Sequence, residues 1–218
     1  ARTAEEAGVH VVTGDTKVVN RGHGDGIYIN TAGIGLIPEG RDLSGASCKP
    51  GDAVIVSGTI GDHGITIMSQ RENLSFSTAL KSDAAPLNHL IARVLDAAPD
   101  VRCFRDPTRG GLASTLNEFA EQSGVDIVIS EDDVPIKDAV RGACDMLGYD
   151  PFQVANEGKM VCVASADQAQ AVIDAMRAVI GTIEESRPER GHKVLLETGF
   201  GSRRILDMLV GEQLPRIC

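Results

Sequence analysis

Short apolar segments typical of β-strands alternate with amphipathic segments typical of helices along most of this sequence. Strand patterns occupy 53–57, 101–105, 125–129 and 159–164, and two or three further strands are expected within 179–205. This alternation predicts an α/β fold with α+β mixed layers, in which helices pack on a mixed sheet.

The helices are predicted from apolar residues that repeat at spacings of three and four. One such helix ends before Pro99. Its apolar residues are Leu87, Leu90, Ile91, Val94 and Leu95. The other predicted helices cover about 63–72, the segment 112–120, a stretch near 137–147 that ends at Gly148, and about 167–178.

The first forty residues are predicted to belong to a different unit. A helix-like segment near Thr3 precedes predicted strands at 9–13 and 27–31, and the polar, proline- and glycine-containing segment 38–51 is the best domain boundary. The sequence opens without Met, so we expect a piece of a longer protein. The predicted parts are 1–40, the end of one domain; 41–210, a complete α/β domain; and 211–218, a tail.

Charge and cysteine content exclude several classes of protein. Lys plus Arg is 21 and Asp plus Glu is 31, so the net charge of −10 argues against nucleic acid as a primary ligand. No apolar run is long enough to span a membrane, and no signal-peptide pattern occurs. The five cysteines form no C-x-x-C pair, which argues against zinc and dithiol redox sites and favours a reducing, cytoplasmic compartment. Cys103 and Cys162 lie in apolar runs and are expected to be buried.

The segment 14–17, Gly-Asp-Thr-Lys, follows a predicted strand and offers a carboxylate, a hydroxyl and an ammonium group. Asp15 is a candidate Mg²⁺ ligand, because that ion takes one or two carboxylates together with substrate oxygens. Lys17 is a candidate for neutralising negative charge that develops during a reaction. The alternative is a hairpin turn whose charges are solvated.

Two glycine-containing segments also follow predicted strands. In 58–64 the glycines let backbone N–H groups approach an anion, although the spacing matches neither the dinucleotide fingerprint nor the P-loop. In 105–112, Thr108 is placed to cap a helix whose first turn contains Gly110 and Gly111, each costing about 1 kcal/mol relative to alanine. Either an anion at this helix end or close helix–sheet packing explains the two glycines.

The last two motifs are 155–159 and the tail. Glu157, between Asn156 and Gly158, is a candidate general base, and the alternative is an exposed turn glutamate. The tail ends in Cys218, and its eight residues reach roughly 26 Å when extended, enough to enter a distant cleft. The alternative for the tail is a frayed terminus.

In this order, the motifs VVTGDTKVV, VIVSGTIGDHG, RDPTRGGL, VANEGK and the closing MLVGEQLPRIC resemble one family over the whole chain. That family is HypE, the carbamoyl dehydratases of nickel–iron hydrogenase maturation, within the aminoimidazole ribonucleotide synthetase-like superfamily. The resemblance implies that 1–40 is the end of an ATP-binding, dimerising N-terminal domain. It also implies that ATP binds between this domain and the C-terminal α/β domain.

The resemblance further implies a reaction and its partners. The carbamoyltransferase HypF loads a carbamoyl group onto the Cys218 sulfur, ATP and Mg²⁺ activate its oxygen, and a thiocyanate remains. The resemblance also implies that the cyanide then passes to a HypC–HypD scaffold and that the full-length protein is a homodimer. Glu157 is implied as the base and Lys17 as the stabiliser of the anionic oxygen. The implied nucleotide-binding residues are Asp15, which is also the metal ligand, Thr16, Asp106, Thr108, Arg109, Gly110, Gly111 and Asn156.

Two other interpretations of the sequence stay open. One is a small-molecule synthetase or kinase of the same superfamily, in which the terminal cysteine is incidental. The other is a non-catalytic carrier fragment that presents Cys218 to partners.

Overall fold

The chain divides into two compact units, Ala1–Asp42 and Leu43–Cys218, and each is described by itself. The computed structural model describes residues 2–24, 26–72, 80–176, 178–186 and 191–208. The predicted tail 211–218, with Cys218, therefore lies outside the described residues.

The first unit begins with helix α1 (Arg2–Ala7), as expected from the sequence. The strands predicted at 9–13 and 27–31 are wrong, because the described residues after α1 in this unit form no β-ladder. Their large apolar side chains are exposed, and Val12 and Ile29 are 89% and 86% accessible. A strand needs a hydrogen-bonded neighbour, and the described part of this unit supplies none to either segment.

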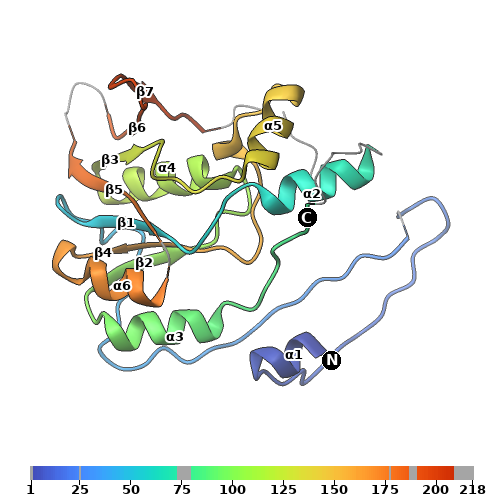
Figure 1. Ribbon diagram of the computed structural model, residues 1–218. Helices are drawn as coiled ribbons and strands as arrows, with labels where there is room; N and C mark the ends of the chain where they lie inside the picture. The colour runs from blue at the N-terminus through green and yellow to red at the C-terminus, as the bar shows by residue number, and fades with distance from the viewer. Residues whose placement is uncertain (1, 25, 73–79, 177, 187–190, 209–218) are drawn as a thin grey trace. The chain divides into compact units, whose positions relative to one another are not determined.

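The second unit is built on a seven-stranded sheet with the order β2-β4-β1-β5-β3-β6-β7 (Figure 1). Neighbouring strands are antiparallel except for β3 and β6, which run parallel. The mixed sheet predicted from the sequence is therefore confirmed. The strands are β1 (Ala53–Val56), β2 (Val101–Arg105), β3 (Val125–Ser130), β4 (Val161–Ala164), β5 (Ala178–Glu185), β6 (Val194–Glu197) and β7 (Arg203–Ile205).

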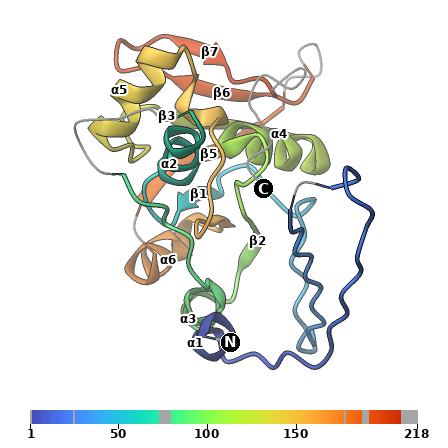
Figure 2. The ribbon, with the colours of Figure 1, turned by 90° about the vertical axis from the view of Figure 1, so that its right-hand side faces the viewer.

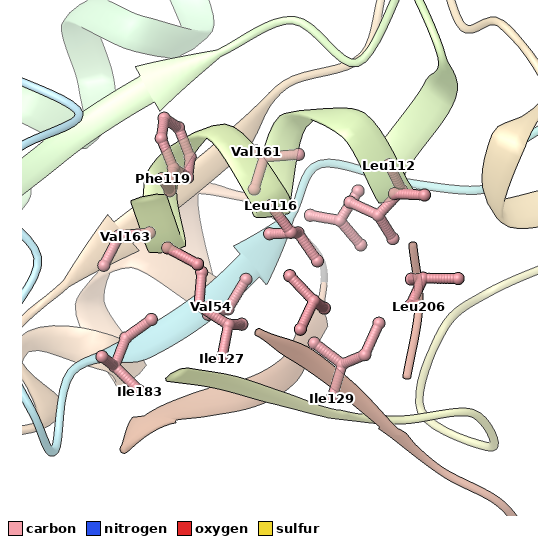
Figure 3. Close-up of a cluster of buried hydrophobic side chains, with 14 of the residues drawn as sticks. Val54, Leu112, Leu116, Phe119, Ile127, Ile129, Val161, Val163, Ile183 and Leu206 are labelled. Atoms are coloured by element: carbon pink, nitrogen blue, oxygen red, sulfur yellow. The ribbon is translucent and has the colours of Figure 1, made fainter. Parts of the chain in front are cut away.

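Helices cover both faces of this sheet (Figure 2). Helix α4 (Gly111–Ser123) packs on one face, where Leu116 and Phe119 join a cluster with Val54 (Figure 3). Helices α3 (Asn88–Ala97) and α6 (Ala169–Ala175) cover the other face, where Ile55 is buried. All four residues of β1 are buried because alternate side chains enter opposite cores, which explains its continuous apolar sequence.

The remaining α-helices of the described residues in this unit are α2 (Asp62–Arg71) and α5 (Asp138–Leu147), both within a few residues of their predicted positions. Two short 3-10 helices, Pro151–Gln153 and Ala166–Gln168, complete the helical elements described. Helix α5 ends at Leu147 and is followed by Gly148, whose φ of 72° is the left-handed conformation typical of a residue that caps a helix C-terminus. The helix predicted to reach residue 178 is too long, because α6 stops at Ala175 and β5 begins at Ala178. From Ala178 onward the chain pairs with β1 and β3 as strand β5. Pairing with distant strands cannot be predicted from the local spacing of apolar residues.

The cysteines of this unit that the structure describes are free and buried. Cys103 and Cys162 are 2% and 0% exposed, which confirms the expectation that they act as small core residues. Burial raises the pKa of Cys162 to about 12 and that of Cys144 to about 11, so both thiols stay protonated at neutral pH. Among the described residues, no helix has the length and apolar character needed to cross a membrane.

Candidate active site

Three of the segments singled out in the sequence meet at the side chain of Asn156, which is 1% exposed. Its Oδ1 accepts a hydrogen bond from the Gly61 N–H at 2.7 Å, and its Nδ2 donates to the carbonyls of Pro107 at 3.1 Å and Val154 at 2.9 Å. The backbone carbonyl of Asn156 accepts the Thr108 hydroxyl at 2.9 Å. One buried amide therefore ties together the segments 58–64, 105–112 and 155–159.

The start of α4 differs from the sequence expectation. Thr108 does not cap the helix, because Gly110 occupies the cap position and the Thr108 hydroxyl is bonded to Asn156 instead. Gly110 also lies outside the helix, with a φ of 67° that favours glycine, so the helix-interior penalty does not apply to it.

Close packing accounts for the second glycine of this pair. Gly111 has a φ of 64°, and an added Cβ would lie 2.5 Å from the carbonyl oxygen of Phe152 and 2.7 Å from that of Val154. The helix start therefore lies directly against the chain that leads into Asn156. The close approach is therefore to the chain at 152–154 and not to the sheet, and anion binding at the same helix end stays a prediction.

A buried carboxylate fixes the segment 58–64 from its other side. Asp62, the first residue of α2, is fully buried, and its Oδ1 lies 3.0 Å from the Nζ of Lys137, next to the start of α5. The hydroxyl of Thr59 donates to its other oxygen. Sequence reasoning missed this role of Asp62, although an acidic residue in the first turn of a helix is the available signal.

Glu157 follows Asn156 directly and is half-buried. Its carboxylate makes no hydrogen bond or ion pair with any described residue. Neither oxygen is therefore occupied by the described part of the chain, while the backbone just before Glu157 is held by the Asn156 hydrogen bonds. A general base must reach the proton that it abstracts, and the role of Glu157 as that base stays a prediction.

Asp106 and Arg109 are exposed beside this cluster. Neither side chain forms an ion pair or hydrogen bond within the described part of the chain. Their carboxylate and guanidinium groups therefore stay available to a ligand. A guanidinium matches the geometry of phosphate oxygens.

The remaining predicted residues lie in the first unit. Asp15, Thr16 and Lys17 are exposed, and the Asp15 Oδ1 accepts the N–H of Thr16 at 2.8 Å. These three residues belong to the first unit, and the Asn156 cluster belongs to the second. Neither unit by itself contains all of the predicted site residues.

The carboxylates of the described residues also bear on metal binding. No group of three His, Cys, Asp or Glu side chains suited to a metal occurs among the residues that the structure describes. Mg²⁺ commonly takes only one or two protein carboxylates and fills its other positions with water and phosphate oxygens. A single exposed carboxylate such as that of Asp15 fits that pattern.

Comparisons with known proteins agree on one family. The model for the AIR synthase related protein, C-terminal domain, matches residues 49–193. The chain is 50% identical over 227 residues to the carbamoyl dehydratase HypE of Azotobacter vinelandii, with 100% of this chain and 65% of that relative covered. The chain therefore spans slightly less than two thirds of the length of this relative.

Solved structures give the same result. The hydrogenase maturation protein HypE in complex with ATP matches with a TM-score of 0.91 and 40% identity, over 100% of this chain and 68% of that one. A HypE–HypF complex matches with a TM-score of 0.86 and 39% identity, over 95% of this chain and 69% of that one.

Proposed function

Since this chain belongs to the HypE family of hydrogenase maturation proteins, we propose that it takes part in an ATP-dependent dehydration. The reaction converts an S-carbamoyl group on Cys218 to a thiocyanate, which provides the cyanide ligand of the iron in a nickel–iron hydrogenase. The observation that carries the proposal is the convergence of three motif segments on Asn156, directly beside Glu157, whose carboxylate has no partner among the described residues.

The chemistry assigns a task to each group. Loss of the carbamoyl oxygen requires a better leaving group than hydroxide, and transfer of the γ-phosphoryl group of ATP to that oxygen provides one. Phosphorylation of the oxygen acidifies the nitrogen, and one nitrogen proton is released to water. Glu157 then removes the second nitrogen proton, the carbon–oxygen bond breaks with release of phosphate, and a carbon–nitrogen triple bond forms. Lys17 stabilises the negative charge on the oxygen. The products are the thiocyanate, ADP and phosphate.

The nucleotide-side residues divide by their contacts. The side chains of Asp106 and Arg109, which have no partner among the described residues, suit direct contact with ATP. The exposed side chains of Asp15 and Thr16 in the first unit suit the same role. Asp15, together with phosphate oxygens, would hold Mg²⁺, and the ion would neutralise charge during phosphoryl transfer. The other proposed nucleotide-side residues support the backbone of the site through their own contacts. They are Thr108, Gly110, Gly111 and Asn156.

The partners follow from the proposed reaction. HypF loads the carbamoyl group, HypC–HypD receives the cyanide, and the full-length protein acts as a homodimer. A solved relative in complex with HypF supports the first of these. Free thiols at Cys48, Cys103, Cys144 and Cys162 support a reducing, cytoplasmic setting.

Deleting Cys218 from the full-length protein tests the loading step. We expect the deletion variant to keep its thermal unfolding midpoint and to accept no carbamoyl group from HypF, because the acceptor sulfur is gone. Intact-protein mass spectrometry after incubation with HypF and its carbamoyl donor measures the outcome. The matched control is Cys144→Ala, which removes a buried thiol and is expected to load normally. Loading of the deletion variant would place the acceptor elsewhere.

A further inference from the structure

The segment 80–86, in which the sequence shows no motif, lies against the loop that carries Glu157. Gly158 has a φ of 62°, and an added Cβ would lie 2.6 Å from the N–H nitrogen of Ala85 and would collide with the carbonyl oxygen of Asp83. The backbones of the two segments therefore touch at Gly158, where only glycine fits.

A partly enclosed ion pair joins the same two segments. The Nζ of Lys159 lies 2.5 Å from the Oδ2 of Asp83, and both side chains are only 12% exposed. The stem of Lys159 passes over Gly58, whose added Cβ would lie 3.2 Å from the Lys159 Cε. The Oδ1 of Asp83 is buried and has no hydrogen-bond partner among the described residues. Lys159 is therefore the group that compensates the Asp83 charge.

The segment 80–86 is also attached to α2. The Oγ of Ser82 lies 2.8 Å from the Nδ1 of His63, and the same oxygen accepts the N–H of Ala84 at 3.3 Å. The position of Asp83 is thus set by contacts on both sides of it in the sequence.

Glu157 consequently sits between two anchors. The hydrogen bonds of Asn156 hold the chain before it, and the contacts of Gly158 and Lys159 with Asp83 hold the chain after it. The carboxylate itself touches none of these groups through a hydrogen bond or ion pair in the described part of the chain. Its placement depends on its neighbours in the sequence.

We propose that Asp83 is a positioning residue for Glu157, acting through Lys159 and Gly158. The inference rests on the proposed function, in which Glu157 is the base. Misplacing a reacting group by about 1 Å lowers a rate by up to about 100-fold. The ion pair of Asp83 and Lys159 therefore controls turnover without contacting the reacting atoms. Loss of this ion pair should lower kcat and leave nucleotide binding unchanged.

The test uses the full-length protein, loaded with a carbamoyl group, and follows thiocyanate formation by mass spectrometry. We expect Asp83→Asn to lower kcat by about 10- to 100-fold and to leave the KM for ATP within about twofold of the wild-type value. Asp83→Glu, which keeps the charge, should retain more activity than Asp83→Asn. An Asp83→Asn variant with wild-type kcat would overturn the inference.

The matched control breaks another enclosed ion pair at the opposite end of β1. Asp52 and Arg102 pair at 3.1 Å, with side chains that are 5% and 20% exposed. Asp52→Asn should lower the thermal unfolding midpoint and leave kcat unchanged when the assay is run well below that midpoint. Equal losses of kcat in Asp52→Asn and Asp83→Asn would mean that the loss of kcat comes from lower stability. That result would overturn the positioning role of Asp83.

A double variant covers the case in which Asp83→Asn does not fold. Asp83→Asn with Lys159→Met removes both charges and leaves no unpaired ammonium group. We expect it to fold and to be as slow as a folded single variant, since both lose the same anchor. Wild-type turnover in the double variant would overturn this inference and leave the proposed function intact. A wild-type protein that forms no thiocyanate would instead remove the proposed function and this inference with it.

Discussion

Glu157→Gln in the full-length protein is expected to bind ATP with wild-type affinity and to form thiocyanate about 100- to 10,000-fold more slowly. Glutamine keeps the size of the side chain but cannot accept the second nitrogen proton. The wild-type carboxylate has no hydrogen-bond or ion-pair partner among the described residues, so the substitution breaks no such interaction in that part of the chain. ATP affinity is measured by calorimetry, and the rate is measured by single-turnover mass spectrometry of the carbamoylated protein.

A second glutamate serves as the control for this variant. Glu131, just after β3, is also half-buried, and its carboxylate likewise has no partner among the described residues. Glu131→Gln should therefore keep the wild-type rate. Thiocyanate formation at the wild-type rate in Glu157→Gln would remove this residue from the mechanism.

Asn156→Ala is expected to lower the free energy of unfolding by about 3–5 kcal/mol. The substitution deletes three side-chain hydrogen bonds and leaves the N–H of Gly61 and the carbonyl of Val154 buried without their partner. Each such group costs about 1–3 kcal/mol. Urea unfolding of the chain, followed by circular dichroism, measures the change.

Asn117→Ala is the control for the loss of a side-chain amide. Asn117 donates to the carbonyls of Ala113 and Leu206, but its side chain is only partly buried, so water can replace it. We expect a loss of about 1 kcal/mol there. A loss of similar size in Asn156→Ala would mean that the three segments are held together by other contacts.

The second unit was largely predictable from the sequence because its strands are buried on both faces. A run such as Ala53–Val56 is apolar at every position, and no exposed helix has that pattern. Gly148 marked the end of α5 because its left-handed conformation favours glycine. The order of the strands in the sheet was not predictable, since it depends on pairings between distant segments.

The first unit shows the limit of local patterns. The residues around Val12 and Ile29 have the composition of strands, yet they form none, because strand formation depends on a neighbour that a local sequence cannot reveal. The prediction that Thr108 caps α4 failed for a similar reason. The Thr108 hydroxyl donates to the backbone carbonyl of Asn156, which is distant in the sequence, and Gly110 is the N-cap residue of α4.

The sequence allowed the segments of the candidate site to be predicted, but not the arrangement of those segments in space. Asn156 and Glu157 were identified by their motif, but the burial of one and the free carboxylate of the other depend on the packing of three loops. Asp83 was missed altogether, because its partner Lys159 is remote in the sequence and nothing near Asp83 indicates an ion pair.

The most direct test follows the mass of the C-terminal peptide in the full-length protein after HypF has loaded it. When ATP and Mg²⁺ are added, the peptide that ends in Cys218 should lose the mass of one water molecule as ADP and phosphate appear in equal amounts. A carbamoylated peptide that keeps its mass while ATP is consumed would contradict the dehydration. So would the same loss of water in a Cys218→Ser variant.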